Sequence, residues 1–415
     1  MTGGTVADAP AAVRWWQLPR PLLVILTAGA VNSLGVGLVL PFTLIYLNRV
    51  FDLTLASAGL VLAVATAVGM AAGLAWGTAI DAFGARTVLA VAAAGQAIGL
   101  FFFAQSRAAV LAVGSWVVIA AFQSATYPSQ STLFAQLSTG ETRSRVFAAN
   151  FVLGNVFVGI GGVIAGSWLS LEADSFRLLY VLDGITFVGL MVAVLVAVPA
   201  ARIRSRPDDS GGGPAERSSW SRTLQHPAFW RLFAMTFLLT TIGQAALEFG
   251  IPSLATAAEL PTSYVAWAFV ANTAAIAVLQ PVLMRYIVKV RRLDAVRLTA
   301  IVWVASGALL AVTSSATGAA LSLGLLLTAA VVVALGEVLL APHLIPLVND
   351  LSPETARGRF NAGISTAFGF AYVDGPVFTT QTLGDRNGIL FVTLVLAAGL
   401  GILATARSLR SGRNT

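Results

Sequence analysis

The chain has 415 residues, of which 57% are hydrophobic and only 10% are charged, and it carries a formal net charge of +7. An ordinary soluble domain has about 25% charged residues, so this composition excludes a soluble protein and indicates one embedded in a membrane. The chain contains no cysteine, which excludes disulfide bonds and thiolate metal sites.

Twelve apolar segments follow one another along the chain, and each is long enough to cross a bilayer, which takes about 20 residues in a helix. They are residues 21–47, 55–80, 86–105, 108–136, 146–171, 177–200, 228–252, 263–285, 293–315, 318–347, 358–380 and 387–407. The sequence therefore predicts an all-α membrane protein with twelve transmembrane helices, surrounded by the lipid bilayer.

The basic residues predict how these helices are oriented. If both termini lie on one side of the membrane, that side holds 21 of the 25 Lys and Arg residues. The remaining four are Arg49, Arg107, Arg177 and Arg386. Cytoplasmic loops carry the excess of basic residues, so we expect both termini in the cytoplasm. The net positive charge follows from this bias, and nucleic-acid binding is not expected.

A polar, basic stretch rich in Gly, Pro and Ser covers residues 201–227 in the middle of the chain. Such a composition is typical of a flexible linker. We therefore expect an N-terminal bundle of six helices at 1–200 and a C-terminal bundle of six helices at 228–415, joined on the cytoplasmic side.

The two halves share an internal repeat. Shifting the sequence by 214 residues aligns the Arg-x-Arg turn at 357–359 with the one at 143–145, and it aligns Glu337 with Gln123. Self-similarity over half a chain predicts two pseudo-symmetric halves with a binding site between them.

The loop after the second segment carries a motif. It reads Gly77-Thr-Ala-Ile-Asp81-Ala-Phe-Gly84-Ala-Arg86 and resembles the G-x-x-x-D-x-x-G-R-[KR] signature of the major facilitator superfamily, with Ala85 in place of the first basic residue. Together with the twelve segments, the repeat and the central linker, the resemblance covers essentially the whole chain. It implies two six-helix bundles that form a secondary active transporter, working by alternating access on a small-molecule substrate and commonly as a monomer.

The same resemblance implies a conformational switch at the cytoplasmic helix ends. Its residues would be Gly77, Asp81, Gly84, Arg86, Arg143, Arg145, Arg357 and Arg359. In that family the acidic and basic residues of the loop belong to a charge-relay cluster that favours the outward-facing state. The alternative is that these residues only cap helix ends and orient the protein.

Two phrases, GGVIAGSWL at 161–169 and APHLIPLVNDLSPETARGRFNAG at 341–363, resemble proton-coupled multidrug-efflux members of the superfamily. The fifth segment, however, lacks the proline of the antiporter signature of that branch, and the fourth segment lacks an arginine often seen there. Export and uptake therefore both stay open.

Acidic residues inside the predicted spans are candidate functional groups. Each of the 25 basic residues falls in a loop, a tail or a helix end, so no fixed cation pairs with Glu248 or Glu337. A carboxylate inside a span costs about 2.5–3.5 kcal/mol, and without a cation it favours its protonated form. Such a group exchanges protons, binds a cationic substrate or sodium, or has a hydrogen-bonded structural role. We expect Glu337 to be the main protonation switch, with Glu248 and Asp374 as further acidic groups, and we expect Asp183 to be interfacial.

Polar and aromatic side chains on the central helices predict where a substrate binds. They are Asn32, Gln123, Tyr127, Gln244 and Trp267. For each of them, hydrogen bonding or packing between helices is the alternative role. His343 lies six residues from Glu337, about 120° around a helix, so we do not expect the two to pair.

The leading hypothesis is a secondary active transporter in the cell membrane (the inner membrane of a cell with two) that exports small hydrophobic or cationic compounds in exchange for protons. Its alternatives are a proton-coupled or facilitative importer of a nutrient or metabolite, and a membrane receptor that does not transport. The chain has no P-loop, no His/Asp metal cluster and no Ser–His pairing. We therefore expect neither enzymatic activity nor a cofactor or metal, and we expect the proton gradient to drive the process.

Overall fold

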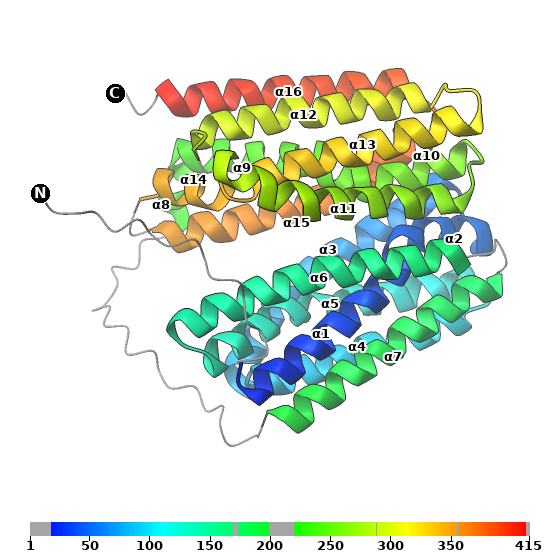
Figure 1. Ribbon diagram of the computed structural model, residues 1–415. Helices are drawn as coiled ribbons and strands as arrows, with labels where there is room; N and C mark the ends of the chain where they lie inside the picture. The colour runs from blue at the N-terminus through cyan, green and yellow to red at the C-terminus, as the bar shows by residue number, and fades with distance from the viewer. Residues whose placement is uncertain (1–17, 169–172, 199–219, 288, 354–355, 412–415) are drawn as a thin grey trace, which may run out of the picture.

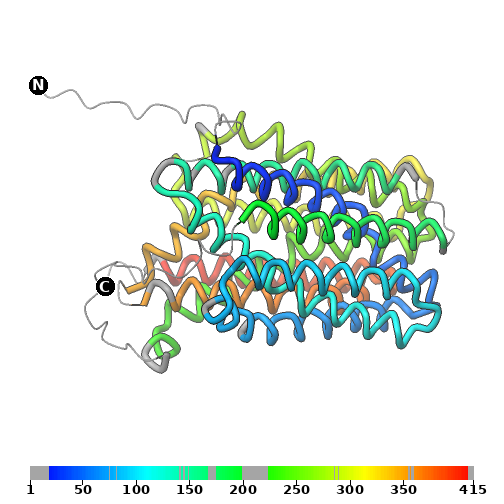
Figure 2. The backbone as a smooth tube through the Cα atoms, turned by 90° about the horizontal axis from the view of Figure 1, so that it is seen from below, coloured from blue at the N-terminus to red at the C-terminus, as the bar shows by residue number. Residues whose placement is uncertain are grey.

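A computed structural model describes residues 18–168, 173–198, 220–287, 289–353 and 356–411. Within these residues the chain is helical and contains no strand. The helix axes are roughly aligned with one another, and the helices form two groups, α1–α7 and α8–α16 (Figures 1 and 2).

The first group begins with a span broken by Pro41, which cannot donate a backbone hydrogen bond and so interrupts the helix. Its elements are α1 (Arg20–Val39), the 3-10 turn η2 (Leu40–Phe42), α2 (Thr43–Phe51), α3 (Leu55–Phe83), α4 (Ala85–Gln105), α5 (Ala109–Leu137), α6 (Gly140–Trp168) and α7 (Ala173–Ala197). The segments α1, η2 and α2 together make one membrane span.

The second group repeats this plan after a short helix, α8 (Trp220–Gln225), which lies at the end of the predicted linker. Residues 201–219 of that linker lie outside the described residues. The remaining elements are α9 (Pro227–Thr240), the π-helix η4 (Thr241–Gly250), α10 (Ile251–Ala257), α11 (Thr262–Ile287), α12 (Arg292–Thr313), α13 (Ala319–Leu340), α14 (Leu344–Leu351), α15 (Arg357–Thr382) and α16 (Gly388–Ser411). One span comprises α9, η4 and α10, and another comprises α13 and α14.

Eleven helical segments of the described chain are long and apolar enough to cross a membrane. The one predicted span that is not among these eleven, 358–380, is present as α15, which has 26 residues but carries more polar side chains than the others. α15 packs against α3 of the first group and against α9 and η4 of its own, so less of its surface has to be apolar. The prediction of twelve helices is confirmed with this one difference in composition.

The two groups are built on the same packing scheme. In the first, α1 packs on α6 and α7, α4 packs on α5 and α7, and α3 packs on α5. In the second, α9 packs on α15 and α16, α12 packs on α13 and α16, and α11 packs on α13. The contacts between the groups repeat as well, because α3 meets α15 and α6 meets α11. The predicted pseudo-symmetric arrangement of two six-helix bundles is therefore confirmed.

The bundles approach each other most closely at one end of the molecule. There α2 contacts α10, and η2 contacts η4. Toward the other end, where α1 begins and α16 ends, the bundles spread apart (Figure 1).

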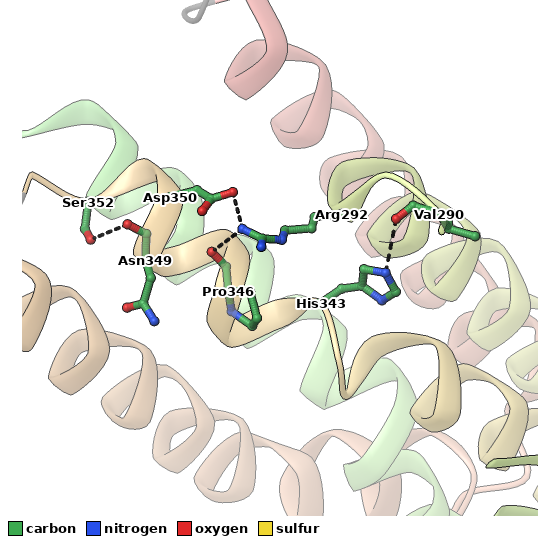
Figure 3. Close-up of polar contacts among 7 residues, drawn as sticks. All are labelled: Val290, Arg292, His343, Pro346, Asn349, Asp350 and Ser352. Carbon is green, nitrogen blue, oxygen red and sulfur yellow. Dashed lines mark hydrogen bonds and ion pairs between the residues drawn. The ribbon is translucent and has the colours of Figure 1, made fainter. Parts of the chain in front are cut away.

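The break between α13 and α14 is held by polar contacts (Figure 3). The ring of His343 lies against the backbone carbonyls of Leu339, 2.9 Å from Nδ1, and Val290, 3.2 Å from Nε2. Arg292, at the start of α12, donates to the carbonyl of Pro346 at 3.0 Å and forms an ion pair with a carboxylate of α14. The loop before α12 and its first turn therefore fix α14, and His343 does not pair with the acid on α13.

Candidate functional site

A cavity of about 380 Å³ lies between the two bundles. Side chains of α1, α2, α3, α4, α5 and α7 form most of its wall, and η4 and α15 close it from the second bundle. The lining is mainly aliphatic and aromatic, with the amides of Gln96 and Gln123 and the hydroxyl of Tyr372 among its polar groups. Its charged groups are the carboxyls of Asp183 and Glu248, and no Lys or Arg is among the described residues that line it. The cavity is therefore apolar with acidic groups.

A polar cluster from four helices of the second bundle lies behind the Glu248 wall of the cavity. The amide of Asn272, on α11, donates to Oε2 of Glu337, on α13, over a long 3.5 Å. Gln244, on η4, also hydrogen-bonds the Glu337 carboxylate. Glu248 lies four residues further along η4, close enough to Glu337 to interact electrostatically, and the Tyr372 hydroxyl of α15 hydrogen-bonds it. The two acids predicted on separate spans thus belong to one cluster, and Glu248 connects it to the cavity.

A buried tryptophan sets the distance between η4 and α13. Trp303 of α12 is 1% exposed, and its indole Nε1 donates to a backbone carbonyl of α13 at 3.0 Å. A Cβ atom added at Gly243 or at Gly336 would overlap the indole ring. These glycines directly precede Gln244 and Glu337, so the indole fits between them only because both side chains are absent. The π-helical turn of η4 adds to this local arrangement, and such turns are frequent at functional sites.

The carboxyls of this cluster have no fixed countercharge. Within the part of the chain that the structure describes, no Lys or Arg forms an ion pair with Glu248 or Glu337. The same residues contain no group of three or more His, Asp or Glu side chains that could hold a metal ion. The hydrogen-bond partners of the two acids are amides and a phenol.

Asp183 is not interfacial, which corrects the expectation from the sequence. The helix α7 begins at Ala173, four residues before the predicted span, so Asp183 is ten residues inside it. Its side chain is buried, with the whole residue 2% exposed, and it lines the cavity. Asn32, predicted to face the cavity, instead lies behind this acid and donates from Nδ2 to the hydroxyl of Thr186 at 3.2 Å.

The other predicted cavity and acidic residues divide into two sets. Gln123 lines the cavity. Tyr127, one turn further along α5, is 71% exposed, Trp267 of α11 is 51% exposed, and neither lines it. Asp374 is exposed and is also not among the lining residues. It follows Tyr372 by two residues, which puts it about 200° around the helix from that tyrosine, on another face of α15.

Two amides and a phenol are among the polar residues of the site that were not predicted. Gln96 donates from its amide to Thr126 at 2.8 Å and lines the cavity, while Asn272 and Tyr372 belong to the cluster around the two acids. Each is a polar side chain inside an apolar span. The same signal identified Gln123, and it would have found these three as well.

Two predicted switch arginines bind the ends of helices. Arg86, at the start of α4, donates from Nη2 to the carbonyl of Leu195 at 2.9 Å, near the end of α7. Arg143 donates from Nη2 to the carbonyls of Ala135 at 2.8 Å and Ser138 at 3.1 Å, at the end of α5. Terminal carbonyls lack a partner within their helix, so both arginines act as helix caps.

The remaining switch residues lie close to the ends of four helices, α3, α4, α6 and α15. Gly84 joins α3 to α4 with a φ of 82°, a conformation that only glycine adopts readily. A Cβ atom at Gly77 would meet no neighbour. Arg145 and Arg359 lie near the starts of α6 and α15. The side chains of Asp81 and Arg357 lie outside the described part of the structure.

A family model described as "Major Facilitator Superfamily" matches residues 25–323, and no curated protein sequence matches the chain. Among solved structures, the chain is similar to a POT family transporter in complex with 5-aminolevulinic acid, with a TM-score of 0.77, 13% identity, and coverage of 94% of this chain and 97% of that one. It is also similar to a bacterial homolog of the human lysosomal transporter Spinster in an inward-facing, unoccupied conformation (TM-score 0.73, 12% identity, 97% and 99% covered). A third similar structure is the nucleoside transporter NupG (TM-score 0.71, 13% identity, 93% and 99% covered). At such identities the likeness shows the fold alone.

Proposed function

Because this chain belongs to the major facilitator superfamily and is a secondary transporter of that type, we propose that it moves a small, largely hydrophobic organic cation across the cell membrane in exchange for protons. Export is the direction that the resemblance of its sequence to drug–proton antiporters supports.

The charge of the cavity is the observation that carries this proposal. Its walls are mainly apolar, and its charged groups are the carboxyls of Asp183 and Glu248. A carboxylate and a cation about 4 Å apart attract each other by about 4 kcal/mol at an effective dielectric constant of 20. An anionic substrate would meet repulsion of the same size and no Lys or Arg among the described residues that line the cavity. A hydrophobic cation therefore fits both the charge and the surface of this cavity.

The cluster around Glu248 and Glu337 supports proton coupling. Two carboxylates near each other without a cation are stable only when a proton or a bound cation neutralises part of their charge. Glu248 belongs both to the cavity wall and to the cluster. A substrate cation that reaches Glu248 therefore displaces a proton, and a proton that returns releases the substrate. This competition is the simplest basis for exchange.

Alternating access follows from the arrangement of the two bundles. They meet through α2 and α10 at one end and spread apart at the end where α1 begins and α16 ends (Figure 1). With both termini in the cytoplasm, this is an inward-facing arrangement. In the proposed cycle, the bundles at 1–200 and 228–415 rock about the cavity while residues 201–227 connect them. A single chain encloses the cavity, which is consistent with a monomer as the working unit.

Transport in proteoliposomes tests the proposal. Purified protein is reconstituted with an acidic interior, the membrane potential is clamped to zero with potassium and valinomycin, and radiolabelled benzyltrimethylammonium is added outside. We expect the cation to accumulate as protons leave, and we expect nigericin, which collapses the pH gradient, to abolish accumulation. Accumulation equal to that of protein-free vesicles would contradict the proposal. Accumulation only with an alkaline interior would instead support cation–proton symport, and with it uptake.

A further inference from the structure

The cavity has a second carboxylate that the proton-binding cluster does not include. We propose that Asp183 is the group of the first bundle that binds the positively charged nitrogen of the transported compound, an inference that rests on the proposed function. It assigns a binding role to α7, on which sequence reasoning placed no functional residue.

The carboxylate of Asp183 has hydrogen-bonding capacity that the protein leaves unused. The residue is 2% exposed and lines the cavity. Its Oδ1 is 3.3 Å from the hydroxyl of Thr186, but that hydroxyl is closer, at 2.7 Å, to the backbone carbonyl of Asp183 and has one hydrogen to donate. Its Oδ2 accepts no hydrogen bond from any residue that the structure describes. An unpaired carboxylate in an interior is costly, and a ligand in the cavity would offset that cost.

The space around the carboxylate is shaped by α1. A Cβ atom added at Gly35 would overlap both the carboxylate of Asp183 and the hydroxyl of Thr186. One turn earlier on α1, the Asn32 amide donates to the same hydroxyl at 3.2 Å. Because the hydroxyl accepts this hydrogen bond, its own hydrogen is directed to the backbone carbonyl of Asp183, 2.7 Å away, and not to the carboxylate. A glycine and an amide on one helix face therefore accommodate the acid and orient its neighbour, as expected of a built site.

The surroundings favour an organic ammonium group over a metal ion. Hard metal ions such as Ca²⁺ and Mg²⁺ take six or more oxygen ligands, and the described residues here contain no cluster of three acidic or histidine side chains. The same cavity presents Trp116 and Phe187. Aromatic faces attract organic cations, and apolar walls match their hydrocarbon substituents. One carboxylate among apolar and aromatic groups suits an alkylated nitrogen.

This assignment divides the partners of the bound cation between the two bundles. Asp183 belongs to the first bundle and Glu248 to the second, and both line one cavity. Only Glu248 also contacts the cluster that contains Glu337. A cation held by Asp183 would therefore also pair with Glu248 while that acid is deprotonated, and the return of a proton to Glu248 would weaken its binding. The substrate would in this way bridge the two bundles that move relative to each other.

Equilibrium binding of benzyltrimethylammonium to purified protein tests the role of Asp183. Removing one partner of a desolvated charge pair weakens binding strongly, so we expect Asp183→Asn to weaken it by at least about 30-fold. Gly35→Ala should weaken binding as well, although it removes no charge, because the added methyl group displaces the carboxylate. Asp174→Asn is the matched control, since Asp174 lies on the same helix with its side chain 89% exposed, and it should bind like the wild type.

A measurement on the wild type covers the case in which Asp183→Asn does not fold. The protein is treated with dicyclohexylcarbodiimide, which modifies carboxyl groups in apolar surroundings, and labelling of the peptide that contains Asp183 is quantified by mass spectrometry. We expect saturating benzyltrimethylammonium to protect this peptide. Either of two results would overturn the inference: labelling that does not change when the cation is added, or a folded Asp183→Asn protein that binds the cation within about twofold of the wild type. The proposed function would remain intact in both cases if the wild type transports the cation. Absence of binding and transport in the wild type would instead overturn the proposed function.

Discussion

The indole of Trp303 packs against α13 at Gly336, directly before Glu337, and this close packing positions Glu337. Replacing Gly336 by alanine tests this role of the indole directly. A Cβ atom at position 336 would lie 2.6 Å from Cδ1 and 2.8 Å from Cε2 of the indole, and closer still to Nε1. Ordinary contact begins at 3.4 Å. Because the interior is close-packed, the indole and α13 must separate by about 1 Å.

The cost of that movement follows from the contacts it disturbs. Overpacking of a buried site costs about 1–3 kcal/mol, and loss of the hydrogen bond from the indole to α13 adds about 1 kcal/mol. The contact between Asn272 and Glu337 is already 3.5 Å long, at the limit of a hydrogen bond. A further displacement of α13 breaks it. We therefore expect Gly336→Ala to lower the free energy of unfolding by about 2–4 kcal/mol and to slow proton-driven transport.

Gly324→Ala is the matched control, because Gly324 lies on the same helix and a Cβ atom there meets no neighbour within 4 Å. An alanine in place of a glycine stabilises a helix by about 0.5–1 kcal/mol when space permits, so this variant should be at least as stable as the wild type. Thermal unfolding in detergent and transport in proteoliposomes measure the two effects. If Gly336→Ala unfolds at the same temperature as Gly324→Ala and transports at the same rate, Trp303 does not position the site.

Substitutions at three other charged residues test their roles, and a fourth substitution serves as a control. Glu337→Gln preserves the shape of the side chain but removes its titratable carboxyl group. Transport driven by a pH gradient should therefore fall to the background rate, while exchange of labelled cation without a gradient continues. Unchanged pH-driven transport would refute the coupling role. Asp374→Asn should keep proton coupling because the residue faces away from the cavity, and loss of coupling would place it in the mechanism. Arg86→Ala and Arg297→Ala each remove a hydrogen bond from an arginine to a carbonyl of a neighbouring helix, since Arg297 donates to Ala406 of α16 at 3.3 Å. Arg297 also pairs with Asp294, so thermal unfolding should show a loss of about 1–3 kcal/mol in each variant, and no smaller in Arg297→Ala. A much larger loss of transport in Arg86→Ala than in Arg297→Ala would show that Arg86 also acts in the switch.

The helices and their two-fold arrangement could be predicted from the sequence, because the apolar requirement of a membrane marks each span and the repeat marks the symmetry. The position at which α7 begins was predicted less accurately. An error of four residues at its start was enough to assign Asp183 to the membrane surface.

The composition of the site was less predictable than the fold. Glu248 and Glu337 were identified one by one from their charge, but their common cluster depends on a π-helix and on the fit of Trp303 between two glycines, which no local pattern encodes. Tyr127 and Trp267 were predicted to line the cavity but do not. A polar or aromatic side chain on a central helix can face away from the cavity, and residue type does not determine the face.

The central claim is that a cation bound in the cavity competes with a proton on the cluster of Glu248 and Glu337, and proton release on binding tests it most directly. Benzyltrimethylammonium is added to the purified wild-type protein in a weakly buffered detergent solution, and released protons are followed with a pH indicator dye. Linkage between the two ligands requires that cation binding expel protons, so we predict acidification that saturates with cation binding and disappears when Glu248 and Glu337 are both replaced by glutamine. Saturable binding of the cation without any change in bound protons, at every pH at which the protein stays folded, would contradict the account.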